Sequence, residues 1–102
     1  MARISIVVRV TVKQGRAGEY LAAFARLLEQ AEREPGTLFY AVNRASDDPD
    51  QFWTIEVYAD QAAFEAHRSS KAHAAADPVF TELIATADVL IGETLLAKGL
   101  GR

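Results

Sequence analysis

The stretch EVYADQAAFEAHRSSKAH, residues 56–73, decides the fold, because it joins the end of a predicted strand to a helix that carries both histidines. Residues 52–58 alternate two sets of side chains, as a strand does. Asp60 is the predicted N-cap of a helix beginning at Gln61, since its carboxylate can accept hydrogen bonds from the free amides of the first turn. Ser69-Ser70 is expected to interrupt this helix.

The residues before this stretch predict a strand, a helix and a second strand. Residues 4–12 place apolar side chains at every second position, the spacing of a strand. Residues 17–32 repeat apolar side chains at the spacing of a helix face, and this pattern stops before Pro35-Gly36. Residues 37–44 predict a strand that forms a hairpin with residues 52–58 through the polar turn at 46–50.

After the histidines, a short helix and a last strand are predicted. Pro78 fits the first position of a helix, and the apolar residues from Val79 to Ala87 favour one or two amphipathic turns. Residues 89–97 are expected to be the last strand. The order strand, helix, strand, strand, helix, strand predicts an α+β fold, the ferredoxin-like split βαβ with helices on one face of an antiparallel sheet.

The predicted strands carry apolar side chains on both faces, which a sheet covered on one side only would expose to water. Examples lie on one face at Ile6, Leu38 and Ile91 and on the other at Val7, Phe39 and Leu90. A second copy of the chain is the simplest cover. We therefore expect a homodimer in which two sheets face each other.

Length and composition set broad limits. With 102 residues, half of them apolar and a quarter charged, the chain is expected to be one globular domain, residues 1–102 with a core at about 3–97. The absence of cysteine excludes disulfides and thiolate nucleophiles. Scattered basic residues and a net charge of −3 argue against nucleic acid. No apolar run suits a membrane span, and the alternation near the N-terminus does not fit a signal peptide, so a cytoplasmic location is the default.

His67 and His73 are the candidate catalytic residues, because histidine exchanges protons near neutral pH. His67 follows Phe64 by three residues and should turn toward the apolar face of its helix. On an unbroken helix His73 would lie roughly 120° around from His67. A shared metal would then require a bend at Ser69-Ser70 and a third ligand such as Asp77, so no metal site is expected.

Aromatic residues near the histidines could line a cavity for a planar ligand, although single aromatics on strands are more often plain core. Glu56 is expected to be structural, with Arg9 as its possible partner within the subunit or across the dimer, and remains a possible second acid-base group. Asn43 could donate a hydrogen bond to a substrate oxygen. The predicted substrate-binding residues are Tyr58, Trp53, Phe64, Tyr40 and Asn43.

Several short motifs together resemble the antibiotic biosynthesis monooxygenase family of small dimeric α+β barrels. They are Glu34-Pro-Gly36 followed by Tyr40, Asp47-Asp-Pro49, Glu56-Val-Tyr58, and Ala63-Phe-Glu-Ala-His67 with His73 six residues further on. The resemblance implies a pocket between sheet and helices where a phenolic, quinol or anthrone-like substrate loses a proton. Its carbanion would then reduce dioxygen without metal, flavin or other cofactor, and one of the histidines would be the base.

Other members of the barrel superfamily leave alternatives open. Haem-degrading relatives use three residues whose positions here hold Val8, Tyr58 and Ala76, so their haem determinants are missing. Some relatives are isomerases of small oxygenated metabolites, and an isomerase or decarboxylase-like activity in the same pocket is not excluded. A small-ligand-binding or stress-response protein without catalysis also fits, because a fold does not determine a function.

Overall fold

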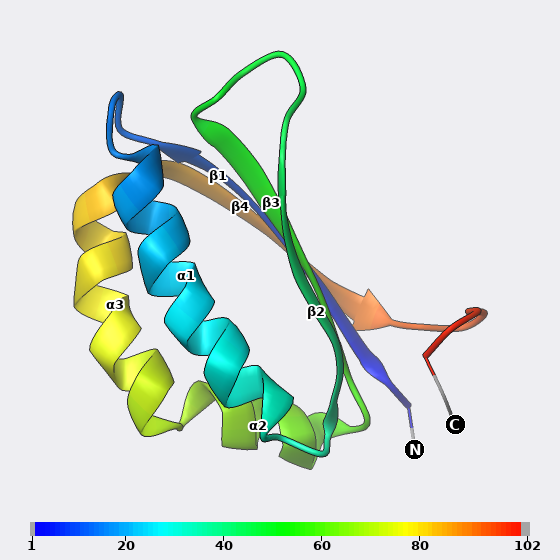
Figure 1. The fold of residues 1–102 in the computed structure, drawn as a ribbon. Coiled ribbons are helices and arrows are strands. Elements are labelled where there is room, and N and C mark those ends of the chain that lie inside the picture. The colour runs from blue at the N-terminus through cyan, green and yellow to red at the C-terminus, as the bar shows by residue number, and fades with distance from the viewer. Residues whose placement is uncertain (1, 101–102) are drawn as a thin grey trace.

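Four antiparallel strands and three helices make up the part of the chain that the computed structural model describes, residues 2–100. The strand order in the sheet is β2-β3-β1-β4, and all three helices lie on one side of it (Figure 1). The predicted ferredoxin-like α+β fold is therefore confirmed. The elements are β1 Ile4–Val12, α1 Ala17–Glu32, β2 Thr37–Arg44, β3 Gln51–Tyr58, α2 Gln61–Arg68, α3 Lys71–Leu83 and β4 Ile84–Glu93.

Side-chain caps separate α2 from α3. Asp60 accepts a hydrogen bond from the backbone N–H of Ala63 at 2.8 Å, as predicted for an N-cap. Ser70 accepts from the backbone N–H of His73 at 3.1 Å and caps α3, so the predicted interruption at Ser69-Ser70 is also confirmed. These two caps fix where each histidine-bearing helix begins.

The third helix is longer than the sequence predicted, and Pro78 lies inside it instead of at its first position. That prediction was wrong because the Ser70 cap and the alanine-rich residues that follow it start the helix much earlier. Proline removes one hydrogen bond from a helix interior. Burial of Ala76 and Leu83, which face the rest of the domain, helps to offset this loss.

The last strand also begins earlier than predicted. It spans Ile84–Glu93 in place of 89–97, because it follows α3 without a loop and pairs with β1 from Val12 to Ile4. The predicted strand residues Leu95 and Leu96 lie beyond it and are 82% and 96% exposed.

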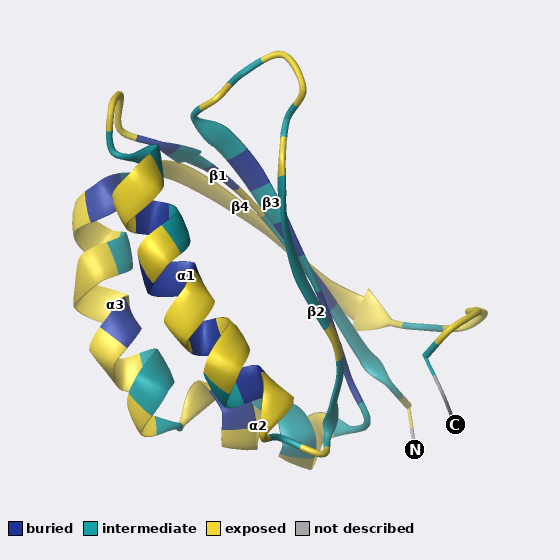
Figure 2. Ribbon diagram, viewed as in Figure 1, coloured by how far each residue is buried: buried dark blue, intermediate teal, exposed yellow. Residues whose placement is uncertain are grey.

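Side chains alternate between two faces of the sheet, which we call the helix face and the open face. The helix face includes Val10 and Phe52, which join Tyr20, Phe24 and Leu83 in the buried core under the helices (Figure 2). The open face carries Val7, Arg9, Trp53 and Leu90. Leu90 is 71% exposed and Phe39 on β2 is 42% exposed, so apolar side chains do remain uncovered on the open face.

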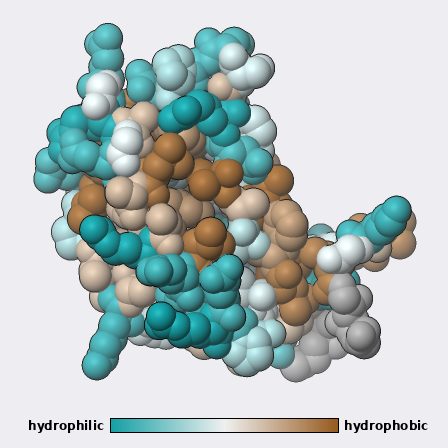
Figure 3. Space-filling model, in the orientation of Figure 1, coloured by the Kyte–Doolittle hydropathy of each residue, from teal (hydrophilic) through white to brown (hydrophobic). Residues whose placement is uncertain are grey.

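Apolar surface continues along β4, whose residues are exposed almost throughout (Figure 2). Val89 and Ile91 lie on the helix side of this strand but beyond the reach of the helices, and they are 55% and 65% exposed. Figure 3 shows apolar atoms gathered near the end of β4 as it is placed in Figure 1. Among the described residues, no helix has the length and apolar character needed to cross a membrane.

Candidate active site

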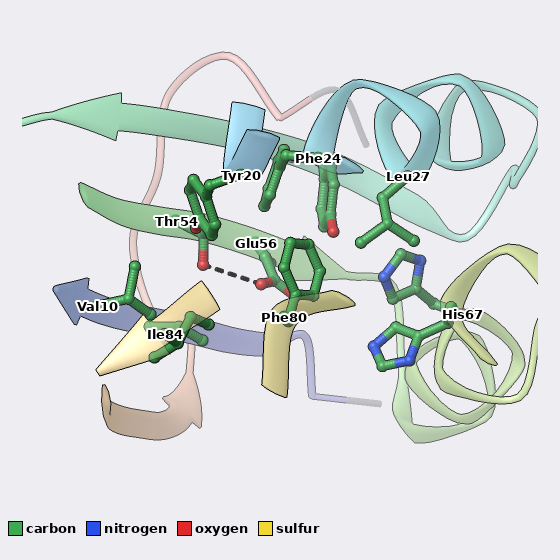
Figure 4. Close-up of a pocket in the computed structure, with 12 residues that line it drawn as sticks. Val10, Tyr20, Phe24, Leu27, Thr54, Glu56, His67, Phe80 and Ile84 are labelled. Carbon is green, nitrogen blue, oxygen red and sulfur yellow. Dashed lines mark hydrogen bonds between the residues drawn. The ribbon is translucent and has the colours of Figure 1, made fainter. Parts of the chain in front are cut away.

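A cavity of about 170 Å³ lies between the helix face of the sheet and the helices, and we call it the inner chamber. Its apolar wall includes Val10, Phe24, Leu27 and Phe80, from β1, α1 and α3. Polar side chains reach it from β3 and from the two histidine-bearing helices (Figure 4). These polar groups are Thr54, Glu56, His67 and His73.

A second cavity of about 290 Å³, the outer chamber, adjoins the first. The two share Val8, Glu56, His67 and His73, so these four residues stand at the junction of the chambers. The outer chamber is completed by Ile6, Phe64, Arg68, Val89 and Ile91.

His67 is held in place by Glu34. The ring is 2% exposed, and its Nδ1 lies 2.8 Å from Oε1 of Glu34, which follows the end of α1. Glu34 also accepts hydrogen bonds from the side chains of Thr37 at 2.8 Å and Gln30 at 3.0 Å. Four groups, from α1, the turn after it, β2 and α2, therefore form one partly buried network behind the histidine.

The network keeps Glu34 ionised. Burial raises the pKa of its carboxyl, but hydrogen bonds from Gln30, His67 and Thr37 outweigh burial and bring the pKa below its ordinary value. A carboxylate accepts and does not donate, so Nδ1 of His67 carries the proton that lies between them. Nε2 has no hydrogen-bond partner among residues 2–100. In the neutral ring this nitrogen is a proton acceptor, which is the requirement for a general base.

Reasoning from the sequence did not single out Glu34 as a site residue. It lies 33 positions before His67, and no local spacing links a carboxylate to a histidine at such a distance. Its place in the Glu34-Pro-Gly36 motif was the only available signal. The bend after α1 is what carries it under α2.

Glu56 is buried, with 9% of its surface exposed, and its two oxygens have different donors. The hydroxyl of Tyr58 donates to Oε1 at 2.6 Å, and the hydroxyl of Thr54 donates to Oε2 at 3.0 Å. Burial and the nearby charge of Glu56 raise the pKa of Tyr58, so this phenol remains a donor at neutral pH.

Within the chain, Arg9 does not pair with Glu56, so that part of the prediction was wrong. Arg9 sits opposite Trp53 in the register of β1 and β3 and points to the open face, where it binds Asp88 at 2.7 Å. Glu56 belongs to the other face, because successive side chains of a strand alternate.

His73 joins His67 at the cavity because the chain bends between α2 and α3. The two rings meet edge to face with their centroids 5.5 Å apart. Nδ1 of His73 lies 3.3 Å from Oδ1 of Asp77, but the geometry is too poor for a hydrogen bond and this buried nitrogen has no partner. Residues 2–100 hold no group of three or more His, Asp, Glu or Cys side chains placed to bind a metal.

The structure brings together three of the five predicted substrate-binding residues. Tyr40 lines the inner chamber, with its ring centroid 5.1 Å from that of His67. Tyr58 is fully buried and lines neither chamber, although its ring centroid lies 5.4 Å from that of His67. Phe64 lines the outer chamber, and its ring is tilted against that of Tyr58 with the centroids 5.3 Å apart.

Trp53 and Asn43 do not reach either chamber. They are paired neighbours on β3 and β2, and Trp53 lines a hollow on the open face with Arg9 and Asp88. The amide of Asn43 donates to the backbone carbonyl of Trp53 at 3.4 Å. The sheet therefore separates both residues from His67 of the same chain.

Comparison with known proteins agrees with this geometry. Residues 3–78 match the family model described as antibiotic biosynthesis monooxygenase. The chain belongs to this family. The match includes β1 to α2 and most of α3, and with them Glu34, Glu56 and both histidines.

Solved structures of this family's fold superpose closely. A Shewanella oneidensis protein is 28% identical, with a TM-score of 0.86 and coverage of 94% of each chain. A candidate antibiotic biosynthesis monooxygenase from Chloroflexus aurantiacus is 25% identical, with a TM-score of 0.83 and coverage of 98% of this chain and 100% of its own. One from Nitrosomonas europaea, at 22% identity, shares the fold with a TM-score of 0.87 and coverage of 96% and 95%. No functionally curated protein gives a significant match.

Proposed function

We propose that this family member is a cofactor-independent monooxygenase that oxidises a small phenolic, quinol or anthrone-like aromatic with dioxygen. The supporting observation is that His67, paired with Glu34 behind it, lines a cavity whose wall carries four aromatic rings, those of Tyr20, Phe24, Tyr40 and Phe80. A base oriented by a carboxylate and facing a cavity of this kind is suited to removing a proton from a bound hydroxyl.

In the proposed reaction, Nε2 of His67 accepts the phenolic proton while Glu34 stabilises the imidazolium that forms. The resulting carbanion transfers electrons to dioxygen. One oxygen atom replaces two hydrogen atoms of the substrate, and the other leaves as water with those two hydrogens. Reducing dioxygen to these two oxygen atoms takes four electrons, and the substrate supplies all four, so the balance requires no external reductant.

The size of the inner chamber favours a single aromatic ring at the histidine. Its volume of about 170 Å³ is close to that of an engineered cavity of about 150 Å³ that binds benzene. A fused tricycle such as an anthrone would have to extend into the outer chamber past Glu56. Single-ring quinols are therefore the first substrates to test.

The test is dioxygen uptake by the metal-free and flavin-free protein with a panel of reduced quinones and anthrones. The wild type should exceed the spontaneous rate, and His67→Ala should lower turnover by about 10² to 10⁴. Lys71→Ala, an exposed residue at the start of α3, is the matched control and should leave the rate unchanged. Uptake that persists in His67→Ala would reject His67 as the base.

No uptake with any substrate would instead favour the isomerase or decarboxylase-like activity, or a small-ligand-binding protein. A ligand-induced rise in melting temperature without turnover would distinguish the binding protein from the enzymes.

We also propose that the chain forms a homodimer through the open face. Exposed Leu90 lines a hollow of about 520 Å³ together with Val7, Trp53 and their neighbours. Phe39, on the same face, is 42% exposed. Apolar patches of this kind on a sheet face are typical of protein interfaces. The ion pair on this face between Arg9 and Asp88 is satisfied within the chain and would not oppose association.

A further inference from the structure

We propose that Glu56 selects ligands by charge, so that the chambers accept neutral or cationic aromatics carrying a hydroxyl or ammonium donor and reject aromatic acids. This inference deepens the proposed function and rests on it for the identity of the site. It concerns binding, however, and is tested without turnover.

The position of Glu56 gives it contact with any ligand that passes between the chambers. Its carboxylate is one of the four groups shared by both cavities, together with Val8 and the two histidines. Figure 4 shows Glu56 reaching the inner chamber from β3, with Thr54 on one side of it. A ligand ring beside His67 therefore lies next to a buried carboxylate.

Glu56 retains capacity to accept further hydrogen bonds. A carboxylate offers about four acceptor positions, and the structure fills two of them with the hydroxyls of Tyr58 and Thr54. The remaining positions suit a hydroxyl or ammonium group of a ligand. The same two protein donors hold the carboxylate still, so it is pre-organised for that contact.

In the described part of the chain, no cationic side chain pairs with Glu56. Arg and Lys are absent from the lining of the inner chamber. The outer chamber has Arg68, which is exposed and lies over the ring of Phe64 at 5.6 Å. Among residues 2–100, Glu56 belongs to no salt bridge.

The other titratable groups around the chambers do not cancel the negative charge of Glu56. Burial, and to a smaller extent the charge of Glu56, raises the pKa of Tyr20 to about 12, and the same two causes raise that of Tyr40. Both phenols therefore stay neutral at neutral pH. Protonated His67 would be matched by ionised Glu34, and His73 faces Asp77. A ligand carboxylate would meet a like charge in a poorly hydrated site.

The test is calorimetric binding of three single-ring ligands of similar size, each with a phenolic hydroxyl. They are 4-hydroxybenzyl alcohol, which is neutral, 4-hydroxybenzylamine, which is cationic, and 4-hydroxybenzoate, which is anionic. The wild type should bind the first two at least about tenfold more tightly than the anion. Equal affinities, or no binding of any of the three, would overturn the inference.

The variant Glu56→Gln keeps the size of the side chain and an acceptor for Tyr58 while removing the charge. It should bring the affinities for the neutral and anionic ligands within about threefold of each other. Glu65→Gln, which removes an exposed carboxylate of α2, is the control and should keep the wild-type preference. An unchanged preference in Glu56→Gln would show that shape, not charge, rejects the anion.

Melting curves establish whether Glu56→Gln is folded before binding is measured. If it fails to fold, the amine in the wild-type series still tests the sign of the charge, because a site that excluded charged ligands through desolvation alone would reject the amine as well as the acid. The binding measurement involves no reaction, so its outcome does not depend on whether the protein catalyses the proposed oxygenation.

Discussion

The helix face and the open face of the same sheet differ in where they keep polar and apolar side chains. On β3, Thr54 and Glu56 are polar and buried under the helices, whereas Trp53 is largely apolar and only half-buried on the open face. Alternate residues of β3 therefore lie in two different environments, the helix-covered core and the open face. Buried polar groups are costly unless they are hydrogen-bonded, so a connected set of them at a cavity indicates chemistry.

The open face gives the complementary signal. Its apolar residues remain in contact with water, with Leu90 at 71% exposure, and its one ion pair is solvent-exposed. Exposed apolar area without a buried polar network indicates association, not catalysis. The comparison therefore assigns the pocket to one face and the proposed dimer to the other, and each assignment is open to a direct test.

The largest effect is expected from a charge on the open face. Leu90→Arg should weaken the proposed dimer at least about 100-fold, because an unpaired cation would be buried at the centre of the interface. Sedimentation velocity across a concentration series measures the dissociation. Leu28→Arg, at a leucine of α1 that is 41% exposed, introduces the same charge on the helix layer and should leave the dimer intact.

If both variants have the wild-type sedimentation behaviour, or if the wild type is monomeric at all concentrations, the open face is not the dimer interface. Circular dichroism establishes that Leu90→Arg is folded, which an exposed position on β4 predicts.

The sequence was sufficient for the fold because its patterns are local. Alternation in residues 4–12, the helical spacing in 17–32 and the Asp60 cap each describe one element, and the structure has these elements at the predicted places. The errors occurred where a local rule competes with its context. Pro78 suggested a helix start, but the Ser70 cap and the packing of α3 kept it in the helix interior.

The candidate site was less predictable because its parts are distant in the chain. Histidine chemistry identified His67 and His73, but the partner of His67 is Glu34, brought under α2 by the turn after α1. The alternation in residues 52–58 implies that Trp53 and Glu56 lie on opposite faces of the sheet, yet aromatic character alone grouped Trp53 with the pocket residues. Only the register of the sheet shows which aromatics share a cavity.

A smaller effect is expected for Glu34→Gln, which removes the charge behind His67. The folded-state pKa of Glu34 is lowered from 4.5, so its ionised form stabilises the fold above that pH. This contribution is lost as pH falls through the folded-state value. The variant should lose about 1–2 kcal/mol of unfolding free energy at pH 7 relative to wild type, and less at pH values below 4.5.

Urea unfolding at a series of pH values measures this difference. Glu29→Gln, on the exposed side of α1, controls for the loss of one surface carboxylate. A constant difference between wild type and Glu34→Gln from neutral to acid pH would contradict the role assigned to its charge.

The last prediction compares the two faces of the sheet through the same threonine-to-valine substitution on each. Thr54→Val removes the hydroxyl that donates to Glu56 at 3.0 Å and should lower the unfolding free energy by about 1–2 kcal/mol, because the donor serves a buried carboxylate. Thr11→Val makes the identical change on the open face of β1, opposite Gln51, and should be neutral within about 0.5 kcal/mol. Chemical unfolding of both variants provides the measurement. Equal losses of unfolding free energy in the two variants would mean that the hydroxyl of Thr54 contributes nothing specific to the site.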